Sequence, residues 1–124
     1  MILIVDDDYD IVLLMKLSLE KAGLSVSYFT NPLMALDTFR QTPSNYDLVI
    51  SDIRMPHLNG YEFVRQIKMI RRDVKVILMS AFELMDAPNS FSNSDIEKFL
   101  EMPIRLHKLN EIVLEYIKEL IIVK

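Results

Sequence analysis

Acidic side chains follow two apolar runs of this chain and are its first candidates for chemistry. Asp52 comes directly after Leu48–Ser51, and the triplet Asp6–Asp8 comes directly after Ile2–Val5. In a doubly wound sheet, strand ends of this kind lie at the edge where ligands bind. Carboxylates that gather there raise each other's pKa unless a hard cation neutralises them, and Mg²⁺ takes oxygen ligands of this type. The two acidic strand ends therefore predict a magnesium site.

Short apolar runs alternate with amphipathic stretches along the chain, and this alternation is typical of βα units. No repeat or low-complexity tract interrupts it. The predicted strands are residues 2–6, 26–28, 48–52, 74–80 and 96–102. Five such units fit one parallel sheet with helices on both faces.

Apolar residues recur at helical spacing between these strands. Asn31 before Pro32 starts one predicted helix, and another follows Asn59-Gly60. The stripe of the first helix is predicted to be Ile11, Leu14, Met15, Leu19 and Ala22, with a cap at Gly23. That of the last helix is predicted to be Leu106, Leu109, Ile112, Val113, Tyr116, Ile117 and Leu120. Residues 84–95 hold Pro88 and several Asn and Ser residues, so a short or distorted helix is expected there.

Length, charge and composition limit the classes of function. The chain has 124 residues, which predicts a single domain over 1–124. A net charge of −4 argues against direct binding of nucleic acid. No cysteine is present, so disulfides and thiolate metal sites are excluded. No apolar run is long enough for a membrane span, and the first residues lack the basic region of a signal peptide, so we expect a cytoplasmic protein with no membrane partner.

The motif context of Asp52 resembles a known family. Met55-Pro56 and Asn59-Gly60 follow Asp52 in the loop, and the acidic triplet precedes it in the chain. In this pattern the chain resembles the receiver domains of two-component response regulators, with the CheY-like chemotaxis regulator as the best-known shape. The resemblance covers the whole chain. It implies an α/β, flavodoxin-like doubly wound sheet of five parallel strands in the order 2-1-3-4-5, in which Asp6, Asp7 and Asp52 converge.

The resemblance also implies roles for the acidic residues. Asp52 is the expected phosphoacceptor, a nucleophile that takes a phosphoryl group from a sensor histidine kinase or a phosphotransfer protein. Mg²⁺ is the expected cofactor, held directly by Asp7, Asp52 and the backbone carbonyl of Arg54, and by Asp6 mainly through water. Such a domain signals and catalyses only its own phosphorylation and dephosphorylation. Asp8 and Asp10 instead fit the positive N-terminal end of the first helix.

Two further positions match the family's switch. Ser80 ends the fourth predicted strand, where a hydroxyl is expected to hydrogen-bond the phosphoryl group. Phe99 is at the switch-aromatic position, where its ring is expected to turn inward and change the surface formed by residues 84–95, 96–102 and the last helix. A plain core aromatic is an equally good interpretation of Phe99.

Met102 departs from the family pattern. Receiver domains normally carry a lysine immediately before the proline that is Pro103 here, and that lysine pairs with a phosphoryl oxygen. A thioether cannot do so, which predicts weakened activation. The resemblance still implies a cis peptide at Met102-Pro103, and Arg54 is a candidate for partial replacement of the charge.

Two other functions compete with the phosphoacceptor. A receiver-like interaction module that works without phosphorylation is consistent with Met102. An aspartate-nucleophile phosphatase would place a second Asp two residues after Asp52, where Arg54 stands. The last helix carries apolar residues off its stripe, at Leu114, Ile121 and Ile122, which predict a homodimer contact or a downstream protein partner. His57 and His107 are expected to be exposed.

Overall fold

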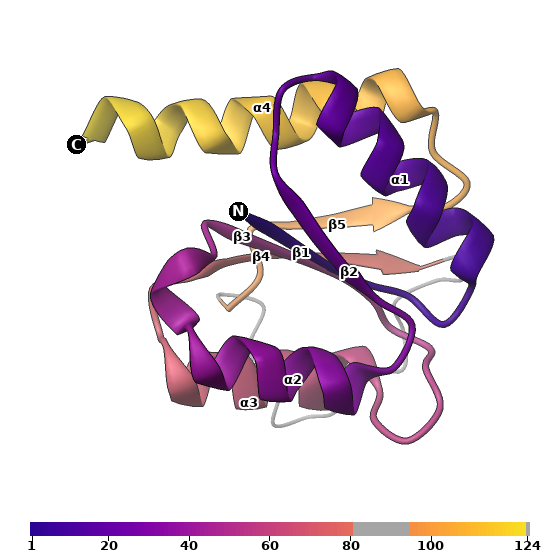
Figure 1. The fold of residues 1–124 in the computed structure, drawn as a ribbon, viewed down its shortest axis with the longest axis vertical. Coiled ribbons are helices and arrows are strands. Elements are labelled where there is room, and N and C mark those ends of the chain that lie inside the picture. Colours follow the sequence, from indigo (N-terminus) through magenta and orange to yellow (C-terminus); the bar gives the residue numbers. More distant parts are fainter. Residues whose placement is uncertain (81–94, 124) are drawn as a thin grey trace.

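The computed structural model describes residues 1–80 and 95–123, with side chains described up to residue 118. Its centre is a five-stranded parallel sheet in the order β2-β1-β3-β4-β5 (Figure 1). The strands are β1 (Ile2–Val5), β2 (Val26–Phe29), β3 (Leu48–Asp52), β4 (Lys75–Ser80) and β5 (Lys98–Glu101). The described helices are α1 (Tyr9–Lys21), α2 (Pro32–Gln41), α3 (Gly60–Ile70), α4 (Leu106–Val123) and a 3₁₀ turn at Pro43–Asn45. The predicted fold class and strand order are confirmed.

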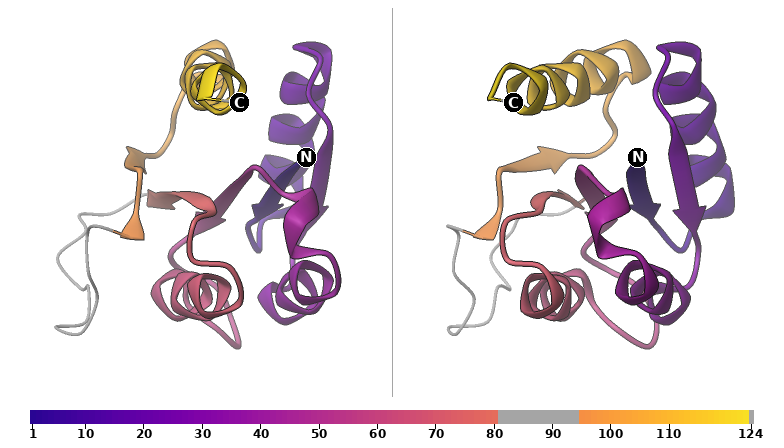
Figure 2. Two further views of the ribbon diagram at one scale, coloured as in Figure 1. Left: turned by 90° about the vertical axis from the view of Figure 1, so that its left-hand side faces the viewer. Right: turned by 60° about the vertical axis from the view of Figure 1, so that its left-hand side comes forward.

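The helices cover both faces of the sheet, α2 and α3 on one and α1 and α4 on the other (Figure 2). Alternating strand residues supply the two cores, because successive side chains of a strand point to opposite faces. In β1, Leu3 and Val5 pack towards α2 and α3, while Ile2 and Ile4 pack towards α1 and α4. The central strands are therefore apolar on both faces, as parallel strands covered on both sides usually are.

Side-chain caps fix where the helices begin. The Asp8 carboxylate accepts hydrogen bonds from the backbone N–H groups of Asp10 and Ile11 at 3.0 and 3.3 Å, so Asp8 caps α1, at the positive helix end where it was predicted to lie. Asn31 caps α2 in the same way, with Pro32 in the first turn. At the other end of α1, Gly23 has a φ of +92° and donates to the carbonyl of Glu20, which is the predicted glycine cap.

The predicted apolar stripe of α1 was wrong in one position. Leu14 is 54% exposed, whereas Val12, which the prediction left out, is fully buried with Met15 and Leu19. Val12, Met15 and Leu19 are three and four residues apart and share the face against the sheet. Leu14 lies about 200° around the helix from Val12, at roughly 100° per residue, and so points to solvent.

Several predicted boundaries shift slightly. β1 ends at Val5, one residue before Asp6, and β4 and β5 are shorter than predicted. Leu106 begins α4 but is 37% exposed, since it stands at the end of the helix. The helix expected over 84–95 falls almost entirely outside the described residues. Among the described helices, none combines the length and apolarity that a bilayer crossing needs.

Candidate functional site

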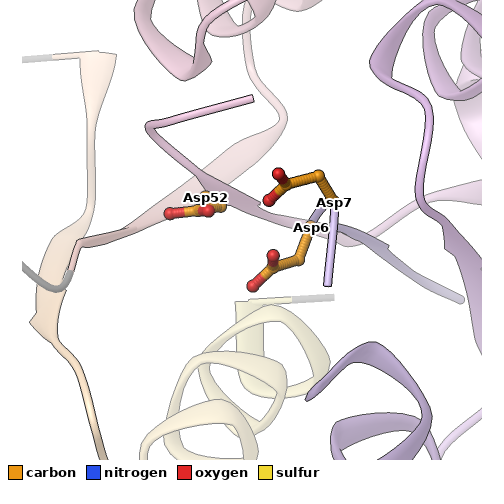
Figure 3. Close-up of side chains that lie close together, drawn as sticks. All are labelled: Asp6, Asp7 and Asp52. Carbon is orange, nitrogen blue, oxygen red and sulfur yellow. The ribbon is translucent and has the colours of Figure 1, made fainter. Parts of the chain in front are cut away.

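The register of the central strands brings the acidic residues together. β1 pairs with β3 in parallel, with Val5 opposite Ser51, so Asp6 and Asp52 follow at the same edge of the sheet. One carboxylate oxygen from each of Asp6, Asp7 and Asp52 lies within 4.8 Å of the others. Figure 3 shows the Asp6 and Asp7 side chains extending from the end of β1 to the side where Asp52 lies. The structure therefore joins the three predicted acidic residues in one cluster.

An open cavity of about 210 Å³ lies over this cluster. Its walls are formed by Asp6, Asp7, Asp8, Ile11, Asp52 and Met102. Met102 reaches the cavity because its backbone N–H donates to the carbonyl of Ser80 at 2.8 Å, which continues the pairing of β5 with β4. The Met102-Pro103 peptide bond is cis, as the resemblance implied. The cavity thus has an acidic floor and a wall that includes a thioether side chain.

Burial and mutual repulsion govern the charges of this cluster. Asp6 is only 5% exposed, and burial, followed by the neighbouring carboxylates Asp52 and Asp7, raises its pKa to about 7. A hydrogen bond from the backbone N–H of Asp8 at 3.0 Å opposes that rise. Burial also raises the pKa of Asp52, and the charge of Asp7 adds to the effect. A hard cation would relieve both costs at once.

The loop after β3 holds the Asp52 side chain in place. The backbone N–H of Ile53 donates to an Asp52 carboxylate oxygen at 2.9 Å and to the carbonyl of Met79 at 3.1 Å.

Further along the same loop, the N–H of Leu58 donates to the carbonyl of Pro56 at 2.8 Å around His57, whose φ is +71°. This is a γ-turn of the rarer, strained hand. This positive φ was not predicted, because the position carries a histidine rather than the glycine that usually marks such a turn.

The other predicted residues take definite places. Ser80 is buried at the end of β4, and its neighbour in β5 is Glu101. Phe99, which pairs with Leu78, is half-buried against the core between the sheet and α2 and α3. Arg54 is exposed in the loop.

Neither histidine is part of the acidic cluster. His57 and His107 are both exposed, as expected. Within the described part of the chain, the metal-capable cluster consists of Asp6, Asp7 and Asp52 alone and includes neither histidine.

The structure combines a doubly wound sheet with an acidic cluster at the ends of β1 and β3, and comparison with known proteins identifies the family. The model of the response regulator receiver domain matches residues 2–114. The chain belongs to this family and is a receiver domain of two-component systems, homologous to phosphorylatable response regulators.

Curated relatives differ in how much of their length the chain matches. Sporulation initiation phosphotransferase F of Bacillus subtilis is 29% identical over 94% of this chain and 92% of its own length. The response regulator receiver protein CpdR of Brucella abortus is 34% identical over 90% of this chain and 92% of its own. The two-component response regulator ARR14 of Arabidopsis thaliana is 31% identical, but the chain spans only 29% of it.

Solved structures share the fold over nearly the whole chain. A receiver domain protein from Clostridium thermocellum superposes with a TM-score of 0.87 at 26% identity, covering 99% of this chain and 98% of that one. The response regulator TrrA of Thermotoga maritima, solved in complex with Mg²⁺-BeF, has a TM-score of 0.80 at 31% identity, covering 93% and 96%.

Proposed function

We propose that this receiver domain accepts a phosphoryl group on Asp52 from a phosphohistidine of a sensor histidine kinase or a phosphotransfer protein. An Asp52 carboxylate oxygen attacks phosphorus, an O–P bond forms, and the N–P bond breaks as the imidazole leaves and takes up a proton. The observation that carries the proposal is the convergence of Asp6, Asp7 and Asp52 on an open cavity. Positioning and charge neutralisation supply most of what such a transfer needs.

The acidic cluster fits Mg²⁺ as the cofactor. We assign Asp7, Asp52 and the backbone carbonyl of Arg54 as direct ligands, and Asp6 as a ligand through water. Two observations support this assignment. Carboxylate oxygens of Asp6, Asp7 and Asp52 lie within 4.8 Å of one another. Burial raises the pKa of both Asp6 and Asp52, and a bound cation would offset that rise. When bound, the ion supplies neutralisation of charge on the transferring group.

Ser80 and Phe99 are the proposed switch. Ser80 ends β4 one residue after Met79, the partner of Asp52 in β3, and this neighbouring position supports a role for its hydroxyl as a donor to a phosphoryl oxygen. Phe99 is two residues along β5 from Glu101, the partner of Ser80. Movement of Ser80 would reach the surface of β5 and α4 through this pairing, with the Phe99 ring acting by packing alone.

A phosphate-independent interaction module is the second candidate. Met102 favours it, because its side chain lines the cavity at the position where the resemblance places a lysine. In either case we propose that α4 offers a surface to a second copy or a downstream protein, with Leu114 exposed on it, and that the domain acts in the cytoplasm. Phosphorylation of Asp52 separates the two candidates.

Intact-protein mass spectrometry after treatment with acetyl phosphate and Mg²⁺ tests the proposal. Wild type should gain one phosphoryl group, Asp52→Asn should gain none, and the control Asp10→Asn, which changes an exposed carboxylate of α1, should label like wild type. Equal labelling of wild type and Asp52→Asn would remove Asp52 as the acceptor. Absence of labelling in a folded, magnesium-binding wild type would favour the interaction module.

A further inference from the structure

Gly60 packs directly against the backbone of Asp52 and Ile53. It is buried at the first position of α3, and a Cβ added there would lie 2.4 Å from the Asp52 carbonyl oxygen and 2.7 Å from the Ile53 Cα. Side-chain carbons do not approach backbone this closely in folded proteins. Both neighbours are backbone atoms, so no flexible side chain can turn away to make room. The backbone of Asp52 and Ile53 therefore leaves no room for a side chain at Gly60.

The peptide that Gly60 touches is the one that holds the Asp52 carboxylate. Its N–H, from Ile53, donates to the carboxylate oxygen and to the carbonyl of Met79. Its carbonyl, from Asp52, accepts a hydrogen bond from the Ser51 hydroxyl at 2.9 Å. Gly60 adds a second contact, because its own N–H donates to the Ile53 carbonyl at 2.8 Å. The start of α3 is thus seated directly on the backbone that aims the carboxylate.

We infer that Gly60 is a positioning residue for the acceptor carboxylate: the start of α3 holds the Asp52–Ile53 peptide at the depth that places Asp52 in the acidic cavity. This inference rests on the proposed function of Asp52. A methyl group at Gly60 would push the helix start and the peptide apart. The N–H of that peptide donates to the Asp52 carboxylate, so the carboxylate would move with the peptide.

Gly60→Ala tests the inference, with Gly23→Ala as its matched control. Gly23 has a φ of +92° and nothing within 4 Å of an added Cβ, and it lies at the far end of α1 from the cavity. Alanine at Gly23 therefore destabilises the fold through backbone strain without touching the site. Thermal unfolding of both variants shows how much stability each has lost.

The readouts are the rate of acetyl phosphate labelling at saturating Mg²⁺, the dissociation constant for Mg²⁺ alone, and the NMR shift of the Ile53 amide proton. Gly60→Ala should label about 10- to 100-fold more slowly, since small misplacements of a reacting group cost this much. It should also bind Mg²⁺ more weakly and shift the Ile53 amide. Gly23→Ala should match wild type in all three. A folded Gly60→Ala protein with wild-type values in all three would overturn the inference.

Two other outcomes are also decisive. If wild type itself does not label, the proposed function fails, but the Mg²⁺ constant and the Ile53 shift of Gly60→Ala still decide whether Gly60 positions Asp52. If Gly60→Ala does not fold, Ser51→Ala replaces it, because it removes the hydroxyl that donates to the same peptide carbonyl. A measurable shift of the Ile53 amide with slower labelling in Ser51→Ala would support positioning through this peptide, and wild-type behaviour would overturn it.

Discussion

The two ends of the parallel strands differ in electrostatics: the edge of the sheet at their carboxyl ends (the carboxyl edge) gathers like charges, and the edge at their amino ends (the amino edge) pairs cations with carbonyl groups. At the carboxyl edge, Asp6, Asp7 and Asp52 crowd together and burial raises the pKa of two of them. At the amino edge, cationic side chains meet backbone carbonyls. Lys68 donates from Nζ to the carbonyl of Val74 at 2.6 Å, and Arg71 donates to the carbonyls of Pro43 and Tyr46.

This difference separates what holds the fold from what serves the site. The amino-edge contacts join α3 to the segments that enter β3 and β4, so they stabilise the sheet without a ligand. The carboxyl edge keeps an arrangement that is unfavourable until a cation or protons neutralise it.

The largest expected effect is at Asp6 in the metal-free protein. Because the folded pKa is about 7 against a usual 3.8, folding is favoured by proton binding, and this contribution is lost as the pH rises from about 4 through about 7. Asp6→Asn keeps the acceptor for the Asp8 N–H but removes the charge. It should raise the free energy of unfolding by about 2–4 kcal/mol at pH 8 in EDTA, since each pKa unit corresponds to about 1.4 kcal/mol.

Urea denaturation at pH 8 and pH 4 checks this prediction. The gain should largely disappear at pH 4 and shrink when Mg²⁺ is added at pH 8. Asp10→Asn, at an exposed position of α1, should change stability little at either pH. Equal free energies of unfolding for wild type and Asp6→Asn at pH 8 would show that the charge of Asp6 does not destabilise the fold.

The next effect is at the amino edge. Arg71→Ala removes two hydrogen bonds from a cation to the backbone carbonyls of Pro43 and Tyr46, and should lower the free energy of unfolding by about 1.5–3 kcal/mol. Labelling of Asp52 by acetyl phosphate should not change. Arg72→Ala, which changes the adjacent exposed arginine, is the control. A slower labelling rate in Arg71→Ala would contradict the separation of the two edges.

A smaller effect is expected from Met102→Lys, which places a cation in the cavity wall. A charge-assisted contact to a phosphoryl oxygen should stabilise the activated state by about 1.5 kcal/mol. With Mg²⁺ and beryllofluoride, a phosphoryl mimic, the NMR shift changes at Ser80 and Phe99 should grow. Glu101→Lys, which adds a cation one residue away at an exposed position, should not enlarge them. A wild type that already responds fully would show that the lysine is dispensable here.

The smallest effect on stability is expected at Leu114, on α4. This side chain is 36% exposed, so Leu114→Glu should leave the free energy of unfolding within about 0.5 kcal/mol of wild type. If α4 forms a homodimer contact, sedimentation should show a dimer in wild type and a shift to monomer in the variant. A wild type that sediments as a monomer at high concentration would leave only a different partner for this surface.

Periodicity was enough to predict the sheet, the strand order came from the resemblance, and both were confirmed. Periodicity was less reliable within α1, where Leu14 was predicted to be buried and Val12 was left out. Each residue fits an apolar stripe at helical spacing, and the sequence alone does not show which stripe faces the sheet. The acidic cluster followed from strand ends, since parallel strands bring their carboxyl ends to one edge.

Other features depend on contacts that a sequence does not display. The need for glycine at Gly60 arises from the Asp52 carbonyl eight residues earlier, and the strained turn at His57 arises from the closure of the same loop. The place of Met102 in the cavity wall depends on the pairing of its backbone with Ser80. Each is a property of two segments together.

The pairing of β1 with β3 sets how far along the strands the carboxylates of the site lie. Val5 is opposite Ser51, so Asp6, the first residue after β1, and Asp52, the last residue of β3, come at the same level along the two strands. Removing one residue from either strand would slide one carboxylate by about 3.3 Å and turn alternate side chains to the wrong face. Strand length between Ile2 and Val5 is therefore as much a determinant of the site as the aspartates, and a search for equivalent sites should require matched strand lengths as well as matched acids.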